Sequence, residues 1–119
     1  MIFEELKVLK MSAHLNESIY KKVKESDTNG YMNQLLQSGL SIVTNIAECL
    51  EKKFSSESPM LLYRARSSCN RLQNYIILVT NTGLIDEKLG RQWLMETNEI
   101  SALITNLINA QTVQRSYHP

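Results

Sequence analysis

The segment from Met32 to Lys53 combines two patterns at helical spacing, and this combination restricts the fold more than any other feature of the chain. Apolar or small residues recur at intervals of 4, 3, 4, 3 and 4 positions, and polar residues follow the opposite side. This spacing is typical of a helix that packs along neighbouring helices in a bundle. The predicted buried positions are Met32, Leu36, Gly39, Val43, Ile46 and Leu50.

The polar side of this predicted helix carries small hydroxyl groups and an amide, which permit close approach by another helix or by a polar ligand. Asn45 and Glu48 point away from the predicted seam. We therefore expect a helix–helix contact between subunits at this side, where an asparagine can fix the register. On this hypothesis, Asn45→Leu alters assembly. The predicted oligomer interface consists of Ser38, Ser41, Asn45 and Glu48.

Four helices are expected, over residues 3–24, 31–53, 59–82 and 87–111. No segment alternates apolar and polar residues for long enough to predict a strand. Short connections make neighbouring helices antiparallel. The sequence therefore predicts an all-α protein, an up-down-up-down antiparallel four-helix bundle. Residues 1–111 are predicted to form this single domain, and residues 112–119 a frayed tail.

The expected helix ends rest on local signals. Ser58 and Pro59 fit the N-cap and first residue of the third helix, because the serine oxygen accepts an N–H and proline has none to lose. Gly83 fits the C-cap of that helix, and Asp86 the N-cap of the fourth. These signals bound the third helix at both ends and the fourth helix at its start.

The first predicted helix has apolar residues over more than half of its circumference, whereas a helix of a monomeric bundle normally shows a narrower stripe. The excess indicates a second buried face in an oligomer. Scattered, exposed apolar residues are the alternative. The apolar positions are Leu6, Val8, Leu9, Met11, Leu15, Ile19, Tyr20 and Val23.

Length and composition bound the class of protein. At 119 residues the chain fits one domain that buries a core without disulfides or metal ions. We expect a cytoplasmic protein without a membrane partner, since there is neither a long apolar run nor a signal-peptide pattern. Cys49 and Cys69 lie outside any metal-ligand spacing and are expected to be small buried or interface hydrophobic residues.

The residues present disfavour catalysis. His14 lies on the polar side of the first helix and His118 in the tail. The Glu-x-x-His pairs of di-metal bundles and a phosphate-cradling glycine loop are missing from the sequence. No serine, cysteine or lysine has an identifiable activating base. We therefore expect no catalytic residue, no metal site and no cofactor.

The charge distribution points to the third helix as the candidate binding surface. Net charge is only +1, from 13 basic and 12 acidic residues, but residues 58–85 contain three arginines and no acid. Guanidinium and amide groups contact phosphate and sugar without reading sequence. A solvated polar face, with arginines paired to Glu48, Glu51 or another subunit, is the alternative. The predicted nucleic-acid-binding residues are Lys52, Lys53, Arg64, Arg66 and Arg71.

The run Ser41-Ile42-Val43-Thr44-Asn45-Ile46-Ala47-Glu48 resembles the motif of a bacterial family of four-helix bundle proteins. This family is also called the S23 ribosomal or 23S rRNA intervening-sequence protein family, and the accessory protein of diversity-generating retroelements belongs with it. The run Asn81-Thr82-Gly83-Leu84-Ile85 resembles a later turn of the family. In length and helix order, the resemblance covers nearly the whole chain. Further matches are Gln34, Leu35, Lys52, Lys53 and Glu57.

The resemblance implies a homo-oligomer, a ring-shaped pentamer, whose partner is structured RNA, an RNA–DNA hybrid or a reverse transcriptase. Our leading hypothesis is a non-enzymatic, nucleic-acid-associated accessory protein that binds mainly through phosphate contacts. The alternative is a protein-interaction scaffold with the same bundle and no nucleic-acid binding. Near-neutral charge favours the scaffold, as does the replacement of an arginine pair of the family by Leu36 and Gln37.

Overall fold

The structure, a computed structural model, describes residues 2–25, 30–53 and 55–116, with Ile2 and residues 113–116 described by their backbone alone. Every regular element in these ranges is an α-helix. Residues 26–29, Phe54, and the tail residues 117–119 with His118 lie outside the described residues. The helices are α1 (Ile2–Glu25), α2 (Gly30–Glu51), α3 (Ser58–Asn81) and α4 (Glu87–Ser116).

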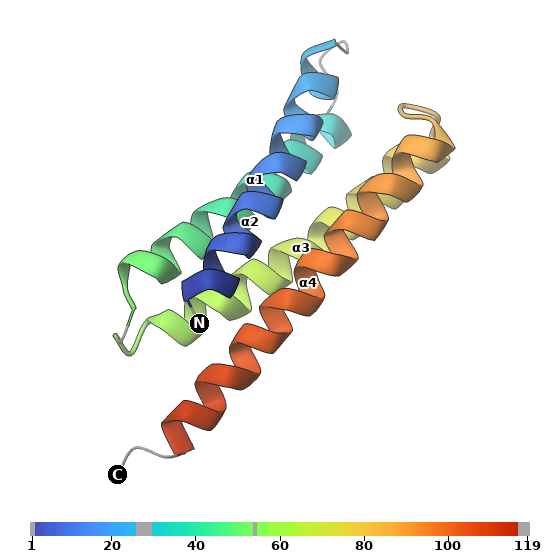
Figure 1. Cartoon of the computed structure of the whole chain (residues 1–119). Coiled ribbons are helices and arrows are strands. Elements are labelled where there is room, and N and C mark those ends of the chain that lie inside the picture. The colour runs from blue at the N-terminus through green and yellow to red at the C-terminus, as the bar shows by residue number, and fades with distance from the viewer. Residues whose placement is uncertain (1, 26–29, 54, 117–119) are drawn as a thin grey trace.

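Consecutive helices run in opposite directions (Figure 1). Each helix packs against the two that are its neighbours around the bundle: α1 against α2 and α4, and α3 against α2 and α4. The predicted all-α, up-down-up-down four-helix bundle is therefore confirmed. The α4 helix is the longest, with 30 residues, and continues to Ser116 rather than ending at Gln111 as expected.

The bundle core is apolar on all four helices and includes Trp93 of α4, which is 1% exposed. On α2, the buried stripe is turned relative to the prediction: Leu35, Ile42 and Cys49 are buried, whereas Leu36 and Val43 are only partly covered. The reason is that α2 contacts two neighbours, so that its side facing α3 is buried as well as its side facing α1. The buried residues of α2 are Met32, Leu35, Ser38, Gly39, Ile42, Ile46 and Cys49.

The end of α3 and the start of α4 follow the predicted signals. Gly83 has φ 79°, its N–H donates to Thr80 O at 3.1 Å, and the Leu84 N–H donates to Val79 O at 3.0 Å. These are the two bonds of a Schellman motif, which requires a residue with positive φ and so favours glycine. Asp86 caps α4, because its Oδ1 accepts the Leu89 N–H at 2.7 Å.

The start of α3 differs from the prediction. Glu57 is the N-cap residue and makes no capping hydrogen bond with its side chain, while Ser58 is already helical. The Ser58 side chain is 4% exposed and turns into the bundle, where its hydroxyl accepts a hydrogen bond from Gln111 Nε2 at 3.0 Å. The Ser58 hydroxyl therefore bonds to a residue of α4 instead of capping the N-terminus of its own helix.

Candidate nucleic-acid interface

The polar side of α2 packs against α3 of the same chain. Ser41 Oγ lies 2.7 Å from Ser68 Oγ, and Asn45 Nδ2 donates to Ser41 O at 2.8 Å and to Ser41 Oγ at 3.2 Å. The Ser68 hydroxyl donates to Arg64 O at 3.0 Å. Because each hydroxyl has one proton, the Ser41 hydroxyl must donate to Ser68. A directed chain of hydrogen bonds thus runs from Asn45 to the backbone of Arg64.

These contacts correct part of the predicted oligomer interface. Ser38 is 1% exposed and donates to Gln34 O at 2.9 Å within its own helix, so it lies in the core rather than on an outer surface. Ser41 and Asn45 are partly buried in the contact with α3. The outer position predicted for Ser38 is wrong because the α2 stripe was placed too far towards α1, while a subunit contact at Ser41, Asn45 and Glu48 stays a prediction. Glu48 is exposed, as expected for an outer position.

Arg64 and Arg71 are both exposed and lie on the border of α3 that faces α2. They are seven residues apart, hence two turns, and Ser68, which contacts α2, lies between them on the same side. Their positions are separated by about 10 Å along the helix axis. Within the described ranges, neither guanidinium forms an ion pair. These two cations are therefore open to a ligand.

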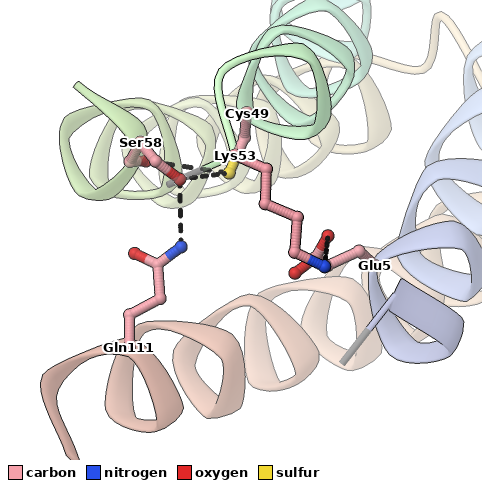
Figure 2. Close-up of polar contacts among 5 residues, drawn as sticks. All are labelled: Glu5, Cys49, Lys53, Ser58 and Gln111. Carbon is pink, nitrogen blue, oxygen red and sulfur yellow. Dashed lines mark hydrogen bonds and ion pairs between the residues drawn. The ribbon is translucent and has the colours of Figure 1, made fainter. Parts of the chain in front are cut away.

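Lys52 and Lys53 follow α2 in the turn towards α3, and both are held by carboxylates. Lys52 Nζ lies 2.6 Å from Glu57 Oε2, and this hydrogen bond raises the pKa of Lys52 and lowers the pKa of Glu57. Lys53 Nζ lies 3.9 Å from Glu5 Oε2 of α1, a residue only 8% exposed (Figure 2). Part of the charge of both lysines is therefore neutralised within the chain.

Arg66 lies on the opposite border of α3, towards α4. Its guanidinium sits over the Tyr63 ring, 5.3 Å from the centroid, and Nη1 donates to Thr105 Oγ1 at 3.4 Å. Gln73, two turns further along this border, donates to Asn98 Oδ1 of α4. Arg64 and Arg71 thus share the border of α3 towards α2, and Arg66 lies on the border towards α4. Lys52 and Lys53 follow the end of α2, where Lys52 and, to a smaller degree, Arg64 lower the pKa of Glu57.

A polar cluster that the sequence did not predict joins three helices at one end of the bundle (Figure 2). Cys49 Sγ lies 3.2 Å from Ser58 Oγ, which also accepts the hydrogen bond from Gln111. Ser58 and Gln111 are 53 positions apart, so no local pattern could have linked them. Burial raises the pKa of the Cys49 thiol. This cluster therefore keeps a neutral thiol in a structural role.

The described residues show no arrangement typical of a metal centre. Among them, no three His, Cys, Asp or Glu side chains gather closely enough to hold a metal ion. Burial raises the pKa of Cys69 to about 12, so this thiol is neutral at physiological pH. His14 is exposed on α1. In the described part of the chain, no helix has the combined length and hydropathy needed to cross a membrane.

The four packed helices define a small helical-bundle protein, and its described part holds no metal-binding cluster. Residues 4–106 match the 23S rRNA-intervening sequence protein family, and the chain belongs to this family. The resemblance found in residues 34–57 is thereby confirmed.

A solved structure has the same fold. It is a protein of unknown function from the S23 ribosomal protein family of Bacteroides thetaiotaomicron, with a TM-score of 0.82 and 22% sequence identity. The match covers 89% of this chain and 98% of that protein. No curated protein matches the chain.

Proposed function

We propose that this chain is a non-enzymatic, homo-oligomeric accessory protein that binds structured RNA or an RNA–DNA hybrid, mainly through phosphate contacts. Membership in the 23S rRNA-intervening sequence protein family supports an RNA-associated role. The observation that carries the proposal is the pair Arg64 and Arg71, exposed on α3 and free of ion pairs within the described ranges.

The electrostatics of this border favour a polyanion. Between Ser58 and Asn81, α3 contains three arginines and no acidic residue. A phosphate near Arg64 or Arg71 is therefore not repelled by any negative side chain on that helix. Glu57, the acid that precedes α3, is hydrogen-bonded to Lys52. The exposed amides of Asn70 and Asn74 can add contacts to phosphate or sugar. Such contacts fix position without selecting a base sequence.

Two arginines make a weak site in a single copy. In an oligomer the pair is repeated. Once one copy has bound the nucleic acid, binding by the next copy is intramolecular, which raises the overall affinity although each copy makes the same contacts. This effect explains how a chain with net charge +1 can bind nucleic acid. It also makes assembly part of the function.

A protein-interaction scaffold is the second candidate. The near-neutral charge and the apolar side chains exposed on α3 favour it, because a protein partner covers such residues whereas a polyanion gains little from them. Met60, Tyr63 and Ile77 are the exposed apolar residues of α3. On this alternative, partner capture is insensitive to salt.

Fluorescence anisotropy tests the proposal. Short structured RNA, an RNA–DNA hybrid and duplex DNA are titrated with the wild type and with Arg64→Ala/Arg71→Ala. The matched control is Lys10→Ala/Arg91→Ala, which removes the same charge from exposed positions on α1 and α4. We expect the α3 variant to lose most of the affinity and the control to retain it. Equal losses in both variants would indicate unspecific charge attraction, and no binding by the wild type would reject the proposal.

A further inference from the structure

We propose that a groove between α1 and α4 binds a small organic acid, whose carboxylate accepts a hydrogen bond from the Trp93 indole N–H and pairs with Lys21. The inference goes beyond the proposed function and does not depend on nucleic-acid binding. We call this place the α1–α4 groove. It has a volume of about 200 Å³, and its lining residues include Ser18, Lys21, Lys22 and Glu25 of α1 and Leu89 and Trp93 of α4.

The α1–α4 groove lies on the side of the bundle away from Arg64 and Arg71. Around the bundle, α1 packs against α2 and α4, and α3 packs against the same two helices, so the α1–α4 seam is opposite the α2–α3 seam. The last two turns of α1 and the first two turns of α4 lie at the same end of the molecule (Figure 1). A ligand in the groove therefore leaves the arginine border uncovered.

Trp93 brings to the groove a polar group that has no partner in the described part of the chain. The residue is 1% exposed and its carbonyl accepts the Thr97 hydroxyl at 2.7 Å, but its indole N–H donates to no described residue. The fully enclosed side-chain N and O atoms that lack a partner in the described ranges are Asn16 Oδ1 and Gln111 Oε1, so Trp93 Nε1 is not sealed in the core. A buried indole N–H normally has an acceptor. The groove is where an acceptor can reach it.

The other polar lining groups favour an anion as this acceptor. Lys21 is exposed and forms no ion pair with the described residues. Ser18 is half-buried, and its hydroxyl bonds to no other described residue. Lys22 Nζ lies 3.9 Å from Glu25 Oε2, so the glutamate offsets one of the two lysines. The lining therefore offers an ammonium, a hydroxyl and an indole N–H, with one net positive charge.

Size and charge select a small carboxylate. A volume of about 200 Å³ is below the roughly 300–1,000 Å³ of sites for drug-sized ligands, so the ligand is a smaller molecule. One net positive charge matches a monoanion better than a phosphate monoester, which carries about −1.5 to −2 at pH 7. Leu89 gives the groove an apolar wall. We expect the carbon body of the acid to lie against Leu89 and its oxygens to meet Trp93 and Lys21.

NMR spectroscopy tests the proposal at the indole itself. Trp93 is the only tryptophan of the chain, so its indole N–H cross-peak is unique. The probes are acetate, butyrate and benzoate, with benzamide as the neutral control and inorganic phosphate as a second anion, all at constant ionic strength. We expect the carboxylates to move the indole proton downfield in a saturable manner and benzamide to leave it unchanged. No saturable shift with any carboxylate, an equal shift with benzamide, or a response to phosphate alone would overturn the proposal.

Two matched charge variants test the contact with Lys21. Lys21→Gln removes the lining ammonium, whereas Lys24→Gln removes the same charge from an exposed position on α1 outside the groove. Circular dichroism melting verifies that both variants fold. We expect Lys21→Gln to weaken benzoate binding by about fivefold, the upper range for a surface ion pair, and Lys24→Gln to change it by less than about twofold. Equal weakening in both variants would indicate general charge attraction and overturn the proposal.

Discussion

Ser41 of α2 and Ser68 of α3 share a hydrogen bond of 2.7 Å between their hydroxyl oxygens. This contact lies within a chain of donors that begins at Asn45 and ends at the backbone carbonyl of Arg64. It fixes the turn of α3 that carries Arg64 against α2. Ser41 and Asn45 of the family motif are therefore engaged within the chain, where α2 meets the turn of α3 that carries Arg64.

The Ser41–Ser68 bond is measurable as a coupling energy. We expect Ser41→Ala and Ser68→Ala each to lower the free energy of unfolding, and the double variant to lose less than the sum by about 0.5–1.5 kcal/mol, a typical net hydrogen-bond contribution. Urea unfolding at equilibrium measures all four proteins. Thr44→Ala serves as control, since its hydroxyl bonds only to Ser41 O in its own helix at 3.2 Å. Additive losses for Ser41 and Ser68 would contradict the bond.

Asn45→Leu separates an internal role of this amide from a role between subunits. The sequence alone predicts a changed assembly, whereas the structure places both hydrogen bonds of Asn45 Nδ2 on Ser41 of the same chain. We therefore expect an unchanged solution mass with a reduced free energy of unfolding. Light scattering and urea unfolding provide the two readouts. A changed mass at unchanged stability would instead support a contact of Asn45 between subunits.

Gly90 allows α4 to approach α3 closely. A Cβ at this position would lie 3.2 Å from Thr80 Cβ and nearer still to its Oγ1, which is held by a hydrogen bond of 2.6 Å to Ile76 O. We expect Gly90→Ala to lower the free energy of unfolding by about 1–3 kcal/mol, because overpacking outweighs the helix propensity of alanine.

Two further variants test this explanation by urea unfolding. Thr80→Ala/Gly90→Ala should recover much of the loss. Gly30→Ala, where nothing lies within 4 Å of the added Cβ, should stay within about 0.5 kcal/mol of the wild type. A Gly90→Ala protein as stable as the wild type would show that the helices separate at little cost.

Cys69 should be unreactive in the folded protein. It is 0% exposed and burial raises its pKa to about 12, so we expect negligible reaction with a thiol reagent near neutral pH until urea unfolds the chain. The raised pKa also sets a pH dependence. Its stabilising effect is fully present below the ordinary value of 9.0 and is lost as the pH rises towards about 12. Cys69→Ala should flatten this alkaline fall, and rapid labelling of the native chain would contradict the buried position.

Arg66 should contribute little to nucleic-acid binding. Its guanidinium lies over Tyr63 and bonds to Thr105, on the border of α3 away from Arg64 and Arg71. We expect Arg66→Ala to lower the free energy of unfolding slightly and to leave the affinity for structured RNA within a few-fold of the wild type. Anisotropy under identical salt conditions provides the comparison. A loss as large as that of Arg64→Ala/Arg71→Ala would place all three arginines in one site.

Local signals predicted much of the fold because their causes are local. Asp86 caps the helix that follows it, and the positive φ of Gly83 ends the helix before it. The prediction at Ser58 failed for the opposite reason. Its hydroxyl has a partner 53 positions away on α4, and this tertiary contact replaced the capping bond that the sequence favoured.

The candidate site was predictable in part. Arg64 and Arg71 are seven residues apart, so helical spacing alone puts them on one border of the third helix and Arg66 on the other, and the structure keeps this division. Spacing could not show that Lys52 and Lys53 would meet Glu57 and Glu5, since these ion pairs depend on the turn after α2 and on the packing of α1. Nor could the spacing of α2 alone decide how its buried stripe is shared between two neighbouring helices.

The most direct test of the central claim is the salt dependence of binding to a short structured RNA, measured for the wild type and for Arg64→Ala/Arg71→Ala. The slope of log K against log salt is negative, and each lost phosphate contact reduces its magnitude by about 0.7–0.9, because fewer counterions are released. We predict a slope shallower by about 1.5 for each copy of the double variant that contacts the RNA, with affinity reduced most at low salt. An unchanged slope, or no binding by the wild type at low salt, would contradict the assignment of Arg64 and Arg71 as the phosphate contacts.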